Sequence, residues 1–415
     1  MTPNVNRRKL LQSVAGASTA GLLAGCIGGG EGGGDDTLRI GLTMPLSGTY
    51  ADVGENNLIS TETTIDLWAD ENGGEIETFV RDTEADPTAA TQVAQELIAE
   101  EDVHMLSGSY SSAAALAIAE VAQQQQTPYL TTAGTTEITG GSCQRYAFAT
   151  NPTTYSTSYA IAQFALENLG NTFYSLVHNY TAGITGHEAT EEIVADGGGE
   201  VIGSSLVDLG QTDVTSEVSA AINSGADILI TNIFGSDLAP VLSQARSFNA
   251  YDEMDVVCSS IDLESMAGID PEIIEGAYGT PQGWWTQEQD EFQNMFLPEF
   301  LERLDRPPGM GAPNIFPAIW TGLDVMHEIE SFGESEEFVR ELEGREWVFK
   351  TYGEDRDGQY FRECDHRCPV PIPIAEAQPA DEVEDEFDYL DLFEYVPAEE
   401  AFQDCEEAGC ELPDY

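Results

Sequence analysis

Lysine is almost absent from this sequence. Only Lys9 and Lys350 occur in 415 residues, and Lys plus Arg total 15 against 75 Asp plus Glu. The formal net charge of -60 would repel nucleic-acid phosphates and anionic membrane surfaces, which excludes functions that need a broad basic surface. At about 1 M salt the Debye length falls to about 3 Å, and the self-repulsion of such a chain is largely screened. The charge therefore indicates a halophilic protein of a salt-rich habitat and does not reveal its function.

Common catalytic motifs are also missing. The sequence has no G-x-S-x-G, no H-E-x-x-H and no P-loop. Beyond residue 9, Lys350 is the only lysine, so amine-based catalysis has one candidate. His104 lies in an apolar strand pattern, which favours a core residue over a base, and the run 355–358 is typical of a turn rather than a calcium loop. We therefore expect no enzyme, no catalytic residue, no cofactor and no bound metal.

Long apolar runs are missing outside the N-terminal region. A basic stretch at Arg7-Arg8-Lys9 precedes a short apolar run, as in secretory signals. The paired arginines resemble a twin-arginine signal, and Leu23-Ala24-Gly25-Cys26 resembles the lipoprotein cleavage box. We predict a signal over 1–26, lipidation of Cys26, a Gly-rich tether over 27–36, and twin-arginine export to the extracellular face of the cytoplasmic membrane. The alternative is an ordinary signal that contains a cysteine.

Six cysteines remain when Cys26 is set aside. An even number in an exported chain predicts disulfides, with fifteen possible connectivities. The run Cys364-Asp365-His366-Arg367-Cys368 has zinc-binding side chains, but its spacing matches no standard structural site. Residues 376–415 carry 16 acids and no Lys or Arg. We interpret them as a solvated acidic tail closed by a Cys405–Cys410 bridge, with partner docking as the alternative.

Strand and helix patterns alternate through most of the chain. Apolar strand patterns lie at 38–44, 75–81, 104–107, 128–132, 173–177, 200–206, 228–231 and 256–259, with helical patterns between them. This order predicts an α/β fold with two doubly wound parallel sheets, and the length also favours two domains. Ligands of such sheets bind beyond the carboxyl ends of the strands, where small and hydroxylic residues collect in this sequence.

Three motifs carry a family resemblance. Residues 40–54 (IGLTMPLSGTYADVG), 108–112 (GSYSS) and 362–366 (RECDH) resemble elements of the type I extracytoplasmic solute-binding proteins of ABC importers. The match is to the branched-chain amino acid (Leu/Ile/Val) branch and covers about 37–375. With the signal and the acidity, the chain resembles a haloarchaeal lipoprotein of that family.

The resemblance implies a periplasmic-binding-protein type I fold with two lobes joined by a three-crossover hinge. Lobe 1 would comprise 37–152 plus 282–345, and lobe 2 would comprise 153–281 plus 346–375. The implied function is a monomeric, lipid-anchored component that binds an amino acid between the lobes and delivers it to ABC permease subunits. A urea- or short-amide-binding transport protein and a ligand-sensing module are the alternatives.

Ligand-binding residues follow from the same resemblance. Ser112 would hold the ligand carboxylate, and the start of the helix that follows it offers free N–H groups and a favourable dipole. Helix capping is the alternative role for Ser111 or Ser112. Asp237 stands where the family has a glutamate for the ammonium group, and it could also cap a helix. The full set implied by the resemblance is Tyr110, Ser111, Ser112, Ala133, Thr135, Tyr180 and Asp237.

Overall fold

The computed structural model describes residues 37–415 except 267, 287–290, 330 and 350–358. The predicted signal, Cys26 and the tether lie outside the described residues, as do Lys350 and the turn at 355–358. Within the described part, no helix is long and apolar enough to cross a membrane.

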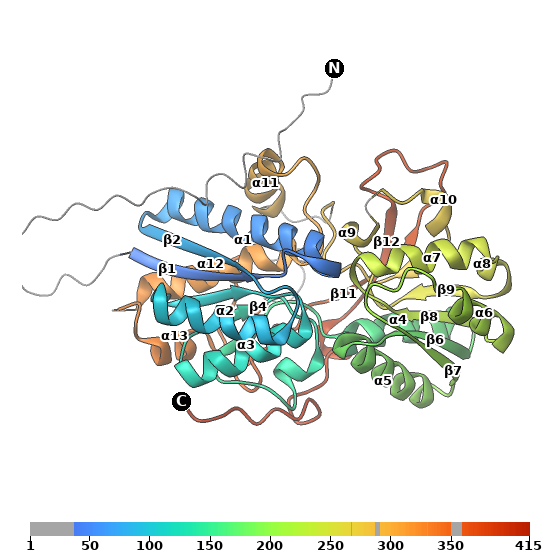
Figure 1. The fold of residues 1–415 in the computed structure, drawn as a ribbon, viewed down its shortest axis with the longest axis horizontal. Coiled ribbons are helices and arrows are strands. Elements are labelled where there is room, and N and C mark those ends of the chain that lie inside the picture. The colour runs from blue at the N-terminus through green and yellow to red at the C-terminus, as the bar shows by residue number, and fades with distance from the viewer. Residues whose placement is uncertain (1–36, 267, 287–290, 330, 350–358) are drawn as a thin grey trace, which may run out of the picture. The chain divides into compact units, whose positions relative to one another are not determined.

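The first lobe is built on a five-stranded parallel sheet with strand order β2-β1-β3-β4-β5 (Figure 1). Helices cover both faces, so strands such as β1 are buried on both sides and consist of apolar runs. The strands are β1 (Thr37–Met44), β2 (Glu75–Asp82), β3 (Met105–Gly108), β4 (Tyr129–Thr131) and β5 (Ala147–Ala149). The connecting helices are η2 (Gly48–Tyr50), α1 (Ala51–Asn72), α2 (Pro87–Glu100), α3 (Ser112–Gln125) and η3 (Thr136–Thr139).

The second lobe is built on a seven-stranded sheet with order β12-β11-β10-β9-β8-β6-β7. Its strands are β6 (Thr172–His178), β7 (Glu200–Val207), β8 (Ile228–Asn232), β9 (Asp255–Cys258), β10 (Tyr278–Gly279), β11 (Ile372–Ala377) and β12 (Leu390–Val396). Strands β6 to β10 are parallel, whereas β11 and β12 are added as an antiparallel pair. Its helices are α4 (Thr154–Asn168), α5 (Thr181–Asp196), α6 (Thr215–Ser224), η4 (Gly235–Asp237), α7 (Leu238–Ser247), α8 (Ala250–Glu253), α9 (Leu263–Met266) and α10 (Pro271–Ile274).

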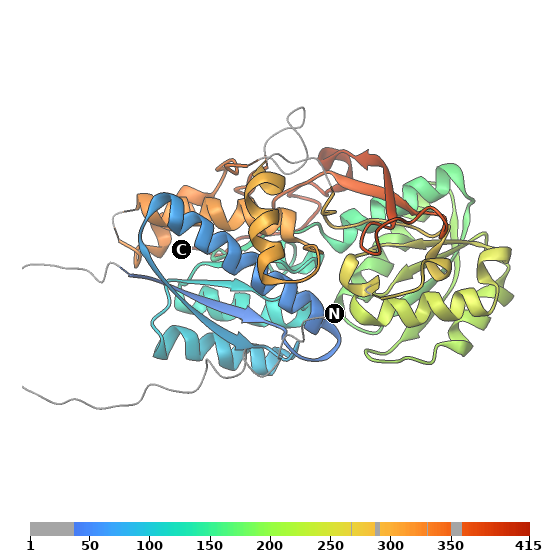
Figure 2. The ribbon, with the colours of Figure 1, turned by 90° about the horizontal axis from the view of Figure 1, so that it is seen from above.

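The chain passes between the lobes three times: after β5, after β10 and before β11. After β10 it returns to the first lobe, where α12 packs against α1 (Figure 2). The returning segment contains η5 (Phe292–Phe296), α11 (Leu297–Arg303), α12 (Ala312–Glu328) and α13 (Ser335–Leu342). The predicted α/β fold of two lobes with parallel sheets is confirmed.

The acidic C-terminal segment is not a solvated tail, and that prediction is wrong. Residues 376–377 belong to β11, and β12 pairs with it along the edge of the second sheet. The apolar end residues Leu390 and Val396 are buried, whereas Asp391 and Glu394 between them are exposed. The acid count hides these buried positions of the strand.

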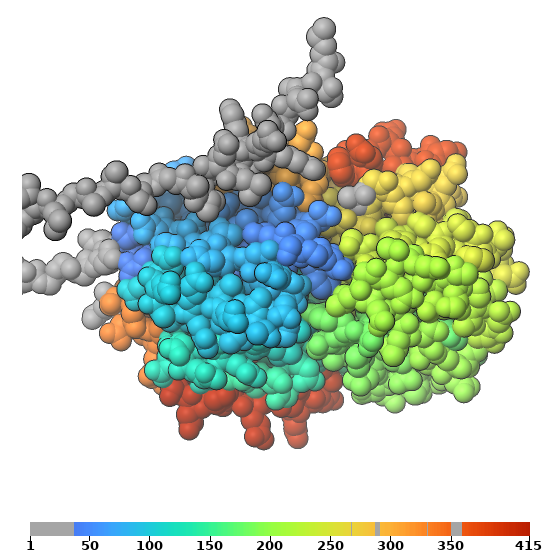
Figure 3. Space-filling model, in the orientation of Figure 1, coloured from blue at the N-terminus to red at the C-terminus, as the bar shows by residue number. Residues whose placement is uncertain are grey.

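The last residues of the chain then return to the first lobe, through α14 (Ala398–Ala401) and beyond (Figure 3, red against cyan). Disulfides join Cys143 to Cys410 and Cys364 to Cys405, so the predicted Cys405–Cys410 bridge is wrong. The side chain of Arg145 donates to the carbonyl of Pro413. Bridges to distant cysteines hold this segment more firmly than a local loop would.

Residues 359–370 also lie against the first lobe, although the resemblance assigned them to the second. Arg367 pairs with Ala149 at the edge of β5, and the ring of Phe361 contacts that of Phe148 edge-on. The third crossover therefore lies just before β11. The remaining lobe boundaries stay predictions.

Candidate ligand-binding site

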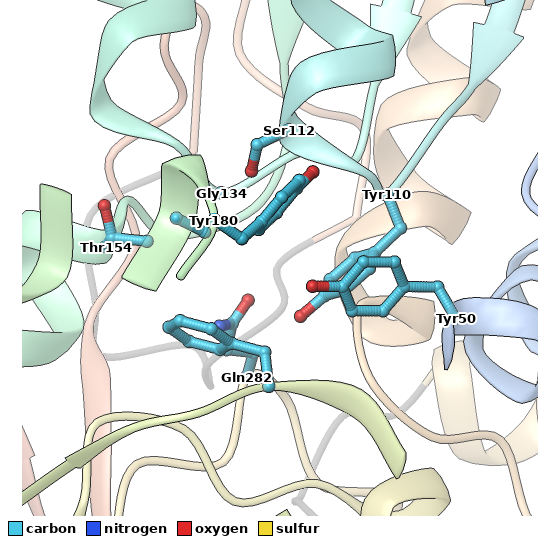
Figure 4. Close-up of a pocket in the computed structure, with 9 residues that line it drawn as sticks. Tyr50, Tyr110, Ser112, Gly134, Thr154, Tyr180 and Gln282 are labelled. Atoms are coloured by element: carbon cyan, nitrogen blue, oxygen red, sulfur yellow. The ribbon is translucent and has the colours of Figure 1, made fainter. Parts of the chain in front are cut away.

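A pocket lies where the carboxyl ends of the two sheets face each other (Figure 4). It has about 290 Å³ of free space, part of which is open to solvent. The first lobe contributes Tyr50, Tyr110, Ser112 and Gly134, and the second lobe and its connections contribute Thr154, Tyr180, Ala182, Phe234 and Gln282. Of the predicted ligand residues, the structure brings Tyr110, Ser112 and Tyr180 together around this space.

The start of α3 forms one end of the pocket, which we call the donor end: Ser111, Ser112 and the N–H of Ala113. Tyr180, at the start of α5 in the other lobe, reaches this point. The N–H of Ala113 donates to its hydroxyl oxygen at 2.9 Å, and the hydroxyls of Tyr180 and Ser111 lie 2.9 Å apart. Desolvation raises the pKa of Tyr180, so the group at the helix start is a neutral phenol. A donor set suited to an anion is thus occupied by the protein itself.

Aromatic rings surround the rest of the space. The rings of Tyr50 and Tyr110 meet edge to face at 5.4 Å, and those of Tyr50 and Tyr180 lie 5.9 Å apart. Together with Phe234 and Met310 they form an apolar cluster between the lobes. Figure 4 shows the hydroxyls of Tyr50 and Tyr110 pointing into the pocket. Burial, followed by nearby negative groups, raises the pKa of both tyrosines well above the usual value.

Asp237, predicted to hold an ammonium group, is bound within the second lobe and is not among the lining residues. Its Oδ2 lies 3.0 Å from Nε2 of His178 and accepts the N–H of Gly210 at 2.8 Å. The N–H of Phe234 donates to Nδ1 of His178, so a neutral imidazole carries its proton on Nε2 and donates it to Asp237. His178 was missed, although its position at the end of a strand was a usable indication.

Two buried carboxylic acids beside the pocket were also missed. Asp262 Oδ1 accepts from the N–H and the hydroxyl of Ser265, and Glu264 Oε2 accepts the N–H of Met310 at 3.0 Å. Burial raises the pKa of both groups, that of Glu264 to about 7, and the charge of Asp262 adds to the effect on Glu264. Asp262 follows strand β9 by only a few residues, and this position at a strand end was the signal in the sequence that could have found it.

An arginine holds backbone carbonyls of the loop after β4, while the buried hydroxyl of Thr135 has no hydrogen-bond partner among the described residues. Buried Arg367 donates to the carbonyls of Ala133 and Thr135, at 3.4 and 3.1 Å, and to that of Asn151 at 2.7 Å. Only Gly134 of this loop lines the pocket. Arg367 was missed because the family motif stops one residue before it.

A metal site is not formed by the cysteine-rich segment. Within the described residues, Cys364, Asp365 and Cys405 are the one group spaced to hold an ion, and the two cysteines are joined in a disulfide. Nε2 of His366 lies 2.8 Å from Glu343, and Cys368 is buried. These contacts assign the segment a structural role.

Comparison with known sequences and structures defines the family. A sequence model described as periplasmic binding protein matches residues 37–382. The chain belongs to this family. It is similar to Leu/Ile/Val-binding protein homolog 6 of Brucella suis biovar 1, with 27% identity over 333 residues that cover 75% of this chain and 82% of the relative.

Solved structures share the fold of this periplasmic binding protein. A periplasmic binding protein from Burkholderia mallei superposes with a TM-score of 0.83 at 22% identity, covering 91% of this chain and 99% of that one. An amino acid ABC transporter substrate-binding protein from Pseudomonas fluorescens gives 0.81 at 21% identity, with the same coverage. Because the members of this family are solute-binding proteins and not enzymes, the prediction that the chain is not an enzyme is confirmed.

Proposed function

We propose that this periplasmic binding protein binds an amino acid, branched-chain or similar, between its two lobes and delivers it to an ABC permease. The observation that carries the proposal is the pocket itself, which is lined from both lobes at the carboxyl ends of their strands. The Leu/Ile/Val-binding names of the Brucella relatives and the amino acid transporter name of the Pseudomonas structure support the ligand class.

Ligand binding would shift the equilibrium between open and closed lobes, and the permease would recognise the closed form. In the structure the lobes already touch, because the hydroxyl of Ser236 in η4 donates to the carbonyl of Thr49 at 3.1 Å. The hydroxyl of Tyr180 also bridges them. Ligand entry therefore requires the second lobe to move away from α3.

Membrane attachment and partners belong to the same proposal. Lipidation of Cys26 after twin-arginine export would keep the monomeric binding protein close to its permease on the extracellular face. Incubation of the expressing cells with a radiolabelled lipid precursor tests this. Label that persists in a Cys26→Ser variant would refute the anchor.

The ligand class is tested by titrating the mature protein in high salt with leucine, isoleucine, valine, glutamate and urea, followed by calorimetry and tryptophan emission. We expect saturable binding of at least one amino acid. If the protein bound urea and none of the amino acids, the alternative of a urea- or short-amide-binding transport protein would be favoured, because urea carries no charge and needs no counter-charge in the site.

A variant pair ties this binding to the pocket. Ser112→Ala removes a lining hydroxyl, whereas Ser204→Ala removes the hydroxyl of an exposed residue on β7 that does not line the pocket. We expect a few-fold loss of amino acid affinity in the first and none in the second. An equal response of both variants would place the binding elsewhere.

A further inference from the structure

The pocket has a second end that is rich in carboxyl and amide oxygens, and the inference drawn from it rests on, and refines, the proposed function. We call Asp262, Glu264 and Gln282 the acceptor end. Gln282 lines the pocket, is 4% exposed, and donates from Nε2 to the hydroxyl of Ser260 at 3.3 Å. In the described part of the chain, its Oε1 has no hydrogen-bond partner. The buried carboxyls of Asp262 and Glu264 hydrogen-bond each other and form an acidic pair.

These three side chains come from neighbouring segments. Asp262 and Gln282 follow the adjacent parallel strands β9 and β10, and the N–H of Ile261 donates to the carbonyl of Thr280 between them. Glu264 is placed by its bond to the N–H of Met310, a member of the apolar cluster that contains Tyr50 and Tyr110. Glu264 is therefore close to the cluster that contains the two tyrosines, while Gln282 lines the pocket itself.

After burial, which has the largest effect, nearby carboxylates also raise the pKa of tyrosines that line the pocket. Asp262 and Glu264 both raise the pKa of Tyr110, while Asp237 and Asp262 raise that of Tyr50. No lysine or arginine belongs to the set of described residues that line the pocket. The cation that faces Glu264 is Arg306, which also lies 3.7 Å from Glu55.

The rings add to the preference for a cation. Tyr50, Tyr110, Tyr180 and Phe234 all line the space, and aromatic faces attract ammonium groups. A primary ammonium also brings three N–H donors, which suit an oxygen that lacks a partner. At the donor end, by contrast, the groups that could hold a carboxylate are bonded to Tyr180.

We propose that the site recognises its ligand chiefly through an organic ammonium group, with Gln282, which lines the pocket, as the acceptor and the buried acidic pair Asp262 and Glu264 as the nearby counter-charge, and that the ligand carboxylate contributes little. Asp237, which accepts from His178, is then a structural group of the second lobe. The selected ligand class is the ammonium-bearing one, and carboxylates without an amine are rejected.

A matched set of ligands tests this on the mature protein. Leucine is compared with 3-methylbutylamine, which lacks the carboxylate, with 4-methylpentanoate, which lacks the ammonium group, and with the neutral 3-methylbutan-1-ol. If another amino acid binds more tightly, its own decarboxylated and deaminated forms are used. We expect the amine to bind within about tenfold of the amino acid, and the acid and the alcohol to bind at least a hundredfold more weakly.

The outcomes separate this inference from the proposed function. Binding of the amino acid with the acid equal to or tighter than the amine overturns the inference alone. Absence of binding by every amino acid and every analogue overturns the proposed function as well.

Variants test the acceptor and the counter-charge. Asp262→Asn keeps the shape of the side chain and removes its charge, and Gln282→Met removes one acceptor without changing charge. We expect each to weaken amine binding at least tenfold and to leave the weak binding of the alcohol unchanged. Asp255→Asn removes a negative charge at the opposite end of β9 and is the control for charge. It should change neither the affinity for the amine nor the affinity for the alcohol. Unchanged amine affinity in both folded variants would refute the assignment.

Discussion

The two ends of the pocket differ in whether their polar groups are satisfied. At the donor end, a phenol from the second lobe bonds the start of α3. At the acceptor end, the buried Oε1 of Gln282 lacks a partner among the described residues and lies beside the acidic pair of Asp262 and Glu264. A buried polar atom without a partner costs about 1–3 kcal/mol, whereas exchanging one bond for another is nearly neutral. A hydrogen bond from the ligand therefore contributes more binding free energy at the acceptor end than at the donor end.

The largest effect is expected from Gly309→Ala, which displaces the carboxyl group of Glu264 at the acceptor end. A Cβ at this position would lie 2.2 Å from the carboxyl atoms of Glu264, so the carboxylate would lose its place on Met310. We expect amino acid affinity to fall by more than tenfold, and the free energy of unfolding to fall by about 1–3 kcal/mol, as for other overpacked sites. Calorimetry and denaturant unfolding measure the two quantities.

Gly333→Ala is the matched control, because its added Cβ would meet only the hydroxyl of Ser331 at 3.9 Å. If the Gly309 variant bound ligand as well as this control does, Glu264 would have no part in the site.

A second effect concerns pH. The pKa of Glu264 is raised to about 7 by burial and by Asp262, so the folded chain holds a proton that an unfolded chain releases near 4.5. An ammonium ligand needs the ionised form, so amino acid affinity should rise about tenfold between pH 6 and 8, with proton release. Titrations in two buffers of different ionisation enthalpy measure that release, and Glu264→Gln should abolish it. An affinity that falls over this range would contradict the prediction.

The same group affects stability with the opposite sign. Because its folded pKa is raised, Glu264 lowers the free energy of unfolding as pH rises from 4.5 to 7, by ~3 kcal/mol at most, and adds no further loss above that range. Denaturant unfolding of the ligand-free protein should show this decline, and Glu264→Gln should lack that part of it. Parallel curves for the two proteins would exclude a raised pKa at Glu264.

The smallest effect is expected at the donor end. Tyr180→Phe keeps the ring and frees the N–H of Ala113 and the hydroxyl of Ser111 for a ligand carboxylate. We expect the affinity for the amino acid to rise by about threefold and the affinity for its decarboxylated amine to stay the same. The measurement is the ratio of these two affinities in the variant and in the unchanged protein. A loss of both affinities by the same factor would show that the phenol is a ligand contact instead of a competitor.

Strand and helix patterns were sufficient for the fold but not for the C-terminal segment. Each predicted strand from 38–44 to 256–259 overlaps a strand of the structure, because strands buried on both faces consist of short apolar runs. The pair β11 and β12 was missed since its acids lie on the exposed face and dominate the composition. Connectivity of the cysteines depends on how that segment folds back, which no local pattern records.

For the site, the sequence by itself determined that loops at the carboxyl ends of parallel strands bind the ligand, because such loops share one edge of their sheet. The motifs in the sequence that resemble the family named Tyr110, Ser112 and Tyr180, and all three line the pocket. Only the tertiary structure decided which polar groups are already paired: Arg367 with the loop at Ala133, Tyr180 with α3, and Asp237 with His178. Pairing is a matter of distances between segments far apart in the chain. Within the described part of the protein, it leaves Oε1 of Gln282 and Oγ1 of Thr135 without a hydrogen-bond partner.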